Sequence, residues 1–136
     1  MSIKSAVYDG RTALVRVDAG GERIEGWAHQ LSESVRALNH LTRDQSVPAP
    51  EVYELLGDLA LAANMLPQLM AQLAAGLAGS LEDYDVYDSA RDPQVSVSTA
   101  REHLEAAAVC AAHVGDALDR AQAAIADQGY TVPPNR

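Results

Sequence analysis

Three residues whose side chains can bind a metal ion lie close together near the C-terminal end of the sequence. His103, Cys110 and His113 are separated by seven and three residues, and imidazole and thiolate groups are common ligands of zinc. In a straight helix the first and last of them would be about 15 Å apart, because a helix rises ~1.5 Å per residue. They therefore do not converge on one ion, and the sequence offers no identifiable fourth ligand. We expect the protein to bind no metal and no other cofactor.

Two further histidines, His29 and His40, share one face of a predicted helix with Glu25, Glu33 and Arg36. That face points away from the apolar stripe of the helix, so we expect it to be solvated and to form ion pairs. An acid–base pair would need a pocket, and we expect this face to have none. The sequence also has no phosphate-binding glycine loop, nucleophile elbow, HExxH motif or Glu-x-x-His di-iron pattern. We therefore expect that the protein is not an enzyme.

Acidic side chains gather in the segment EDYDVYD at residues 82–88. An EF-hand calcium loop counted from its second residue would need glycine in the sixth place and glutamate in the twelfth, where this sequence has aspartate and glutamine. Two interpretations stay open. The segment is a solvated connection, or its tyrosines and acids mimic phosphates for a basic protein or insert into a groove. The candidate partner-binding residues are Asp83, Tyr84, Asp85, Tyr87 and Asp88.

The formal net charge of −9 is carried entirely by the second part of the chain. Residues 1–48 hold six basic and six acidic side chains, whereas residues 49–136 hold four basic and thirteen acidic ones. An acidic surface repels phosphate backbones and anionic lipids, so we expect neither direct nucleic-acid binding nor membrane association. The one cysteine cannot form an internal disulfide, and no signal segment opens the sequence, so we expect a cytoplasmic protein.

One uncharged segment, Leu59 to Leu81, is about long enough to cross a bilayer. Asn64, Gln68 and Gln72 nevertheless recur every four residues and form a polar stripe on one helix face. The flanking residues are acidic, whereas the ends of membrane helices are rich in lysine and arginine. The segment therefore indicates a helix that is buried on most sides within a soluble protein.

The hydrophobic periodicity predicts an all-α fold, an up-down-up bundle of three long helices in one domain. A short N-terminal β-hairpin arm is expected around Asp9-Gly10, a dipeptide that favours a type I′ turn. Ser98 or Thr99 is expected to cap the third helix. Along residues 1–136 the expected elements are the arm at 3–17, helices at 22–42, 50–80 and 98–128, an acidic loop at 82–97 and a tail at 129–136.

The helix expected at 50–80 has an apolar arc that is wider than one partner helix needs, and Pro67 inside it is expected to cause a kink. A wide exposed apolar strip marks an interface, and symmetric dimers are the commonest oligomers. We therefore expect a homodimer joined mainly through this helix. The interface candidates are Leu61, Met65, Leu69, Leu73 and Leu77.

Two segments, VRALNHLTR at 35–43 and VYELLGDLALAANMLPQLMAQLAAGL at 52–77, are followed by an acidic spacer and an alanine-rich helix. Together they resemble a group of short uncharacterised actinobacterial proteins, many of them encoded beside replication or transfer genes of mobile elements. The resemblance covers residues 25–128. It implies a cytoplasmic helical accessory protein and brings no catalytic residues.

Taken together, these features predict a non-catalytic helical interaction or assembly protein, a homodimer with a further protein partner still to be identified. One alternative is a regulator that binds a small apolar ligand in a cavity beside Pro67, near Met65, Met70 and Trp27. The other alternative is an acidic mimic of nucleic acid that captures a basic protein through the loop after Glu82.

Overall fold

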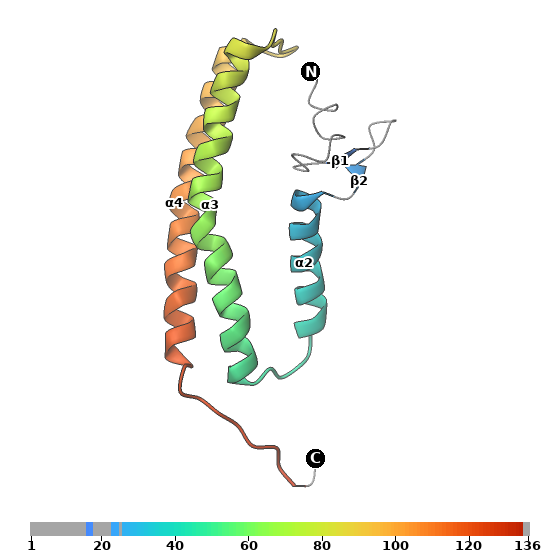
Figure 1. Ribbon diagram of the computed structural model, residues 1–136, viewed down its shortest axis with the longest axis vertical. Coiled ribbons are helices and arrows are strands. Elements are labelled where there is room, and N and C mark those ends of the chain that lie inside the picture. Colours follow the sequence, from blue (N-terminus) through green and yellow to red (C-terminus); the bar gives the residue numbers. More distant parts are fainter. Residues whose placement is uncertain (1–15, 18–22, 25, 135–136) are drawn as a thin grey trace. The chain divides into compact units, whose positions relative to one another are not determined.

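The computed structural model describes residues 16–17, 23–24 and 26–134 of the chain (Figure 1). The all-α prediction is confirmed, because three helices make up most of this part: α2 (Trp27–Thr42), α3 (Ala49–Asp83) and α4 (Pro93–Ala124). The chain divides into two compact units, residues 1–47 and residues 48–136. The first unit contains α2, and the second contains α3 and α4.

Two short strands precede α2 in the first unit. Strand β1 (Arg16–Val17) pairs antiparallel with β2 (Arg23–Ile24), so that Arg16 lies opposite Ile24. The β-hairpin expected at 3–17 lies outside the described residues except for its last two. Those two residues pair with the segment that follows them.

Helix α2 begins at Trp27, later than the expected residue 22, and ends at Thr42 as expected. The later start has a local cause, since residues 23–24 are used in β2 and Gly26 is extended, with φ −166° and ψ 170°. After the helix, Asp44 adopts a left-handed conformation with φ 55°. Aspartate tolerates this conformation better than most residues, and it turns the chain out of the helical path.

Helix α3 is 35 residues long and runs from Ala49 to Asp83, slightly beyond both ends of the expected 50–80. Pro50 lies in the first turn, where its missing N–H group costs nothing because no helical partner exists there. The helix continues through Pro67, although proline removes one hydrogen bond from a helix interior. The position of this proline inside the helix is as the sequence suggested.

Helix α4 begins at Pro93 and ends at Ala124, so both ends lie earlier than in the expected 98–128. The expected N-cap at Ser98 or Thr99 is wrong. Asp92 is the N-cap, and its Oδ1 accepts a hydrogen bond of 2.9 Å from the backbone N–H of Gln94. An aspartate N-cap followed by proline at the first helical position is a strong helix start. The acidic connection therefore shrinks from the expected 82–97 to residues 84–92.

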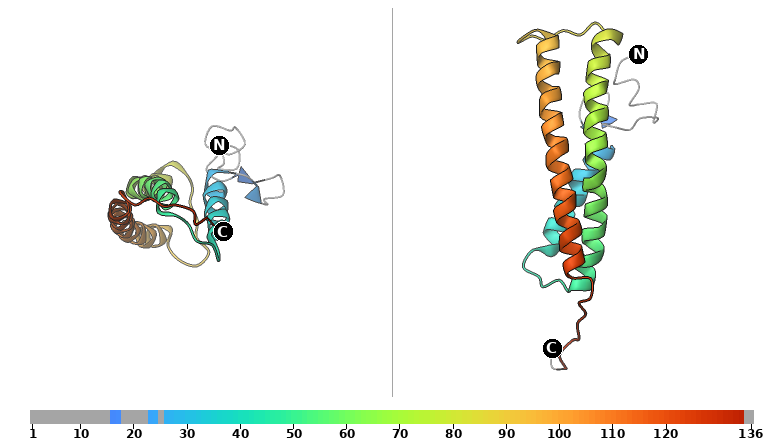
Figure 2. Two further views of the ribbon diagram at one scale, coloured as in Figure 1. Left: turned by 90° about the horizontal axis from the view of Figure 1, so that it is seen from below. Right: turned by 90° about the vertical axis from the view of Figure 1, so that its left-hand side faces the viewer.

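Helices α3 and α4 lie side by side as an antiparallel hairpin (Figures 1 and 2). Small residues form the contact between them. The buried residues of the two helices are Ala60, Ala63, Ala74, Ala111 and Gly115. Among the described residues, no large side chain is fully buried. The two backbones can therefore approach closely at these positions, while several large apolar side chains remain exposed on the outside of the hairpin.

Two polar contacts link α3 to α4. Asn64 Nδ2 donates to Asp119 Oδ2 at 3.4 Å, and its carboxamide lies in the space that Gly115 leaves, where a Cβ atom would overlap Asn64. Further along, Gln122 Nε2 donates to the backbone oxygen of Tyr53 at 3.0 Å. Both contacts depend on how the two helices are aligned along the hairpin, so together they fix the register of the helices.

We predict that Gly115→Ala will be less stable than a glycine-to-alanine change at an unobstructed helical position. Gly79 is the matched control, because a Cβ atom there would meet nothing within 4 Å. Replacing glycine by alanine in a helix stabilises by about 0.5–1 kcal/mol. At Gly115 the methyl group displaces the Asn64 carboxamide and breaks its hydrogen bond, a loss of about 1 kcal/mol. Urea unfolding at one protein concentration measures both variants.

The double variant Asn64→Ala/Gly115→Ala tests whether the Asn64 carboxamide is the group that opposes the added methyl group at Gly115. With the carboxamide absent, the added methyl group should stabilise the helix relative to Asn64→Ala alone. If Gly115→Ala and Gly79→Ala gain the same stability in the native background, the close contact at Gly115 is not present in solution.

Candidate functional site

A row of large apolar side chains winds obliquely around the outside of α3. Its members recur every four residues and are all exposed, between 36% and 60% of their surface. We call them the leucine row: Leu61, Met65, Leu69, Leu73 and Leu77. The sequence analysis predicted these five side chains as interface candidates. All five are accessible in the helical hairpin. A contiguous exposed apolar strip is typical of an interaction surface.

The C-terminal end of the leucine row borders an apolar groove between the two helices. The groove has a volume of about 530 Å³, and its walls are almost entirely apolar. It is lined by Leu73, Leu77, Ala100, His103 and Leu104. The sequence alone does not predict this groove, because it arises only where the second half of α3 lies against the first half of α4.

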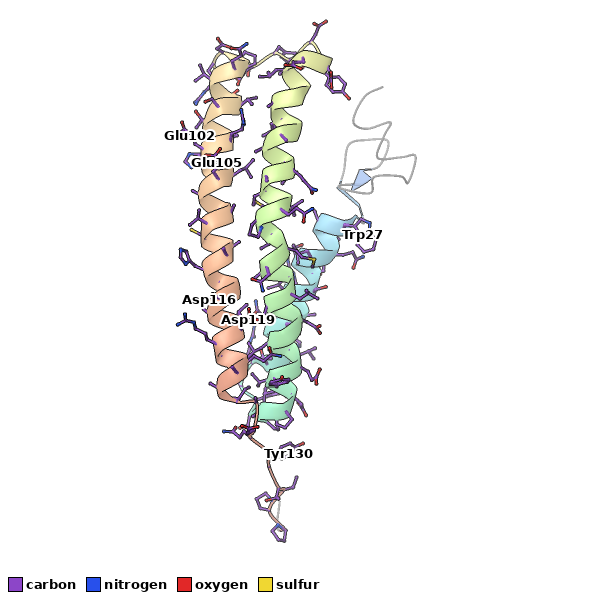
Figure 3. All side chains as sticks on the ribbon, turned by 60° about the vertical axis from the view of Figure 1, so that its left-hand side comes forward. Trp27, Glu102, Glu105, Asp116, Asp119 and Tyr130 are labelled. Atoms are coloured by element: carbon purple, nitrogen blue, oxygen red, sulfur yellow. The ribbon has the colours of Figure 1, made fainter. Side chains whose placement is uncertain are left out.

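The side of α4 that borders the groove continues as a surface without formal charges. Starting from His103, steps of three and four residues stay on one helix face. They lead through exposed small or apolar side chains: Ala107, Cys110, Val114, Ala117 and Ala121. The carboxylates of α4 lie elsewhere around the helix, with Glu102 and Glu105 toward its N-terminal end and Asp116 and Asp119 further along (Figure 3). The groove therefore opens onto a neutral flank of the hairpin.

The acidic loop candidates fall into two classes. Asp83 is the last residue of α3 and Tyr84 its C-cap, so both belong to the helix end. Asp85 is exposed, and Tyr87 is 90% exposed. Asp88 is engaged in the loop itself, because its Oδ1 accepts hydrogen bonds from the backbone N–H groups of Ala90 at 2.9 Å and Arg91 at 3.2 Å. Asp88 is therefore the candidate whose side chain is engaged in hydrogen bonds within the loop, while the side chains of Asp83, Tyr84, Asp85 and Tyr87 are exposed.

The hydrogen bond from the Ala90 N–H group holds the pKa of Asp88 below its ordinary value, and contacts with Ser96 and Arg91 act in the same direction. The cause is that these donors stabilise the ionised carboxylate. A depressed pKa means that the carboxylate stabilises the loop conformation above its ordinary pKa. This contribution is lost when the pH falls through the depressed value.

The histidines and the cysteine lie on exposed surface. His103 lines the groove, while Cys110 is a free thiol and His113 is exposed. Within residues 26–134 and the two short strands, no group of three or more His, Cys, Asp or Glu side chains is placed to hold a metal ion. In the other unit, Arg36 forms an exposed ion pair of 3.3 Å with Glu33 on α2.

The uncharged segment from Leu59 to Leu81, which is about as long as a membrane span, lies within α3. None of the helices in the described part of the chain combines the length and the hydropathy that a bilayer crossing requires.

No protein-family model, no curated protein and no solved structure matches this chain. The resemblance to actinobacterial accessory proteins therefore stays a prediction.

We predict that the backbone N–H signal of Ala90 in an NMR titration will report a carboxyl group with a depressed pKa. The hydrogen bond from Ala90 to Asp88 stabilises the ionised form, so the midpoint should fall below the ordinary aspartate value of about 3.9. In the control Asp88→Asn, the titration of this signal should disappear. A midpoint at or above the ordinary value would show that the loop hydrogen bonds do not form.

Proposed function

We propose that the protein is a non-catalytic interaction or assembly protein that works as a homodimer and is accessory to another system. The observation that supports this most directly is the leucine row. The most buried residues of the hairpin are alanine and glycine, and five large aliphatic side chains of α3 stay exposed to water. A second protein that covers the row removes this apolar surface from water, which is favourable.

The free energy gained by burying the leucine row is similar in size to the free-energy cost of dimerisation. Burying an aliphatic side chain completely contributes about 1.5–3 kcal/mol, so burying the exposed half contributes about 1 kcal/mol. Two leucine rows together then offer about 10 kcal/mol, which is comparable to the association cost of about 4–15 kcal/mol. Because the two terms are similar, a single charged substitution within the row is enough to prevent association.

Three further parts of the proposal rest on the sequence. A cytoplasmic location is supported by the lone cysteine, which cannot form an internal disulfide. The up-down-up order of the three helices and the N-terminal β-hairpin arm follow from the hydrophobic pattern. The acidic loop remains the candidate site for a further protein partner, with Asp83, Tyr84, Asp85 and Tyr87 as its exposed members.

A second candidate function is regulation by a small apolar ligand, and the groove is the observation that favours it. Its volume of about 530 Å³ lies within the range of about 300–1,000 Å³ that is typical of ligand pockets. The groove lies further along α3 than the position beside Pro67 that the sequence suggested, at Leu73 and Leu77. In a thermal-shift screen, a ligand of the folded protein would raise the melting temperature.

We predict a dimer of twice the chain mass of 14.4 kDa when light scattering is measured at tens of micromolar protein. Leu69→Glu should convert it to monomer, because a carboxylate in the centre of an apolar interface loses its hydration without a compensating partner. Val109→Glu is the matched control, since Val109 is also exposed but lies on α4 outside the leucine row. A strict monomer for the native chain at this concentration would overturn the proposed function.

A further inference from the structure

The apolar groove between α3 and α4 continues along the hairpin beyond Leu104. On α3, steps of three and four residues back from Leu73 lead to Met70 and Leu66, which are half-buried. On α4 the continuation is the uncharged flank described above: Ala107, Cys110, Val114, Ala117 and Ala121. Asn64 lies against Gly115, so the two continuations run at the same height in the antiparallel hairpin. We call the groove and its two continuations the apolar trough.

The apolar trough is a different surface from the side of α3 that carries Leu69. The residues of α3 that are buried against α4 lie opposite Leu69 on the helix: Ala60, Ala63 and Ala74. The trough lies between these two sides of α3, where Met70 and Leu66 are half-buried. The proposed homodimer contact at Leu69 therefore does not occupy the trough.

The shape of the apolar trough fits a helix that carries large side chains. Its side on α4 consists mostly of alanine, which leaves room for the side chains of a partner, while leucine and methionine of α3 form a higher wall. Seventeen residues separate Leu104 from Ala121, which is about 26 Å along the helix. An amphipathic helix commonly binds in such a groove through apolar side chains spaced three and four residues apart.

Charge complementarity favours a basic partner. The trough itself carries no formal charge, but residues 82–105 around its loop end hold seven acidic and only two basic side chains. Glu102 and Glu105 lie on α4 close to this end (Figure 3). At the opposite end, residues 49–58 of α3 hold three acidic and no basic side chains. An apolar surface with acidic surroundings attracts a partner of positive charge and disfavours an acidic one.

We infer that the apolar trough binds an amphipathic helix of another protein, which carries large aliphatic side chains on one face and lysine or arginine on the remainder. This inference rests on the proposed interaction function and names the chemistry of the further protein partner. The acidic loop is then the charged end of one continuous site, in which the apolar side chains of the partner fill the groove beside Leu77 and Leu104.

Synthetic peptides of about 18 residues test the inference with the full chain. The first peptide has leucine at spacings of three and four and lysine elsewhere, the second has glutamate in place of lysine, and the third is a scrambled form of the first. Fluorescence anisotropy measures their binding. The lysine peptide should bind at least tenfold more tightly than either control. Added salt should weaken its binding, because salt screens attraction between exposed charges.

The native thiol of Cys110 reports where the peptide binds, since it is exposed on the α4 side of the trough. Saturation with the lysine peptide should slow the alkylation of Cys110 by iodoacetamide at least tenfold. The scrambled peptide should leave the rate unchanged. Full reactivity of Cys110 in the saturated complex would place the peptide elsewhere and overturn the inference.

The remaining outcomes separate this inference from the proposed homodimer. Equal binding of the lysine and glutamate peptides overturns the inference, because charge then does not select the partner. Failure of the lysine peptide to bind also overturns it, including the case in which a second copy already covers the trough. A chain that is monomeric by mass and binds the lysine peptide in the trough supports this inference, although the homodimer then fails.

A pair of substitutions with the same change of charge provides an independent test. Ala117→Arg places a cation and a long side chain in the trough, so it should raise the dissociation constant of the lysine peptide at least tenfold. Ala112→Arg is the control, since Ala112 is exposed and lies two residues from Cys110 and Val114, on the other side of α4. Circular dichroism checks that both variants fold. Equal dissociation constants for the two variants would overturn the inference.

Discussion

The close contact between α3 and α4 determines which side chains of the second unit are exposed on its surface. Alanine and glycine at the most buried positions of the contact let the backbones approach, and no leucine or methionine of the two helices is fully buried there. A helix of 35 residues with many aliphatic side chains must then carry several of them on its outer surface. The exposed leucine row is therefore a direct result of the small residues inside the hairpin.

Contacts between these small residues do not favour one alignment of the helices along their axes. Polar contacts between the helices therefore define the alignment. The alanines would pack almost equally well if one helix slid along the other. A shift by one turn, however, would separate Asn64 from Asp119 and Gln122 from the Tyr53 carbonyl. It would also move Asn64 away from the space at Gly115. The groove beside Leu104 depends on the same alignment, since its walls belong to different helices.

The sequence predicted the helices and the leucine row because both depend on local periodicity. It misplaced the start of α4, since the hydrophobic pattern begins later than Asp92 and Pro93, which cap the helix without contributing to the apolar face. It also misplaced the start of α2, where a strand occupies the first residues. The groove and the contact between Asn64 and Asp119 were beyond prediction, because both require the register of two segments that are distant in sequence.

The two ends of the helical hairpin are held closed in different ways. At one end the loop at 84–92 joins the helices covalently. At the other end, where α3 begins and α4 finishes, the hydrogen bond between Gln122 and the Tyr53 backbone oxygen links the helices, and the contact at Asn64 links them nearer the middle of α3. Helix termini are normally the first parts of a protein to fray. Here the side-chain bonds oppose fraying at the open end, so slow amide hydrogen exchange should extend close to the first turn of α3.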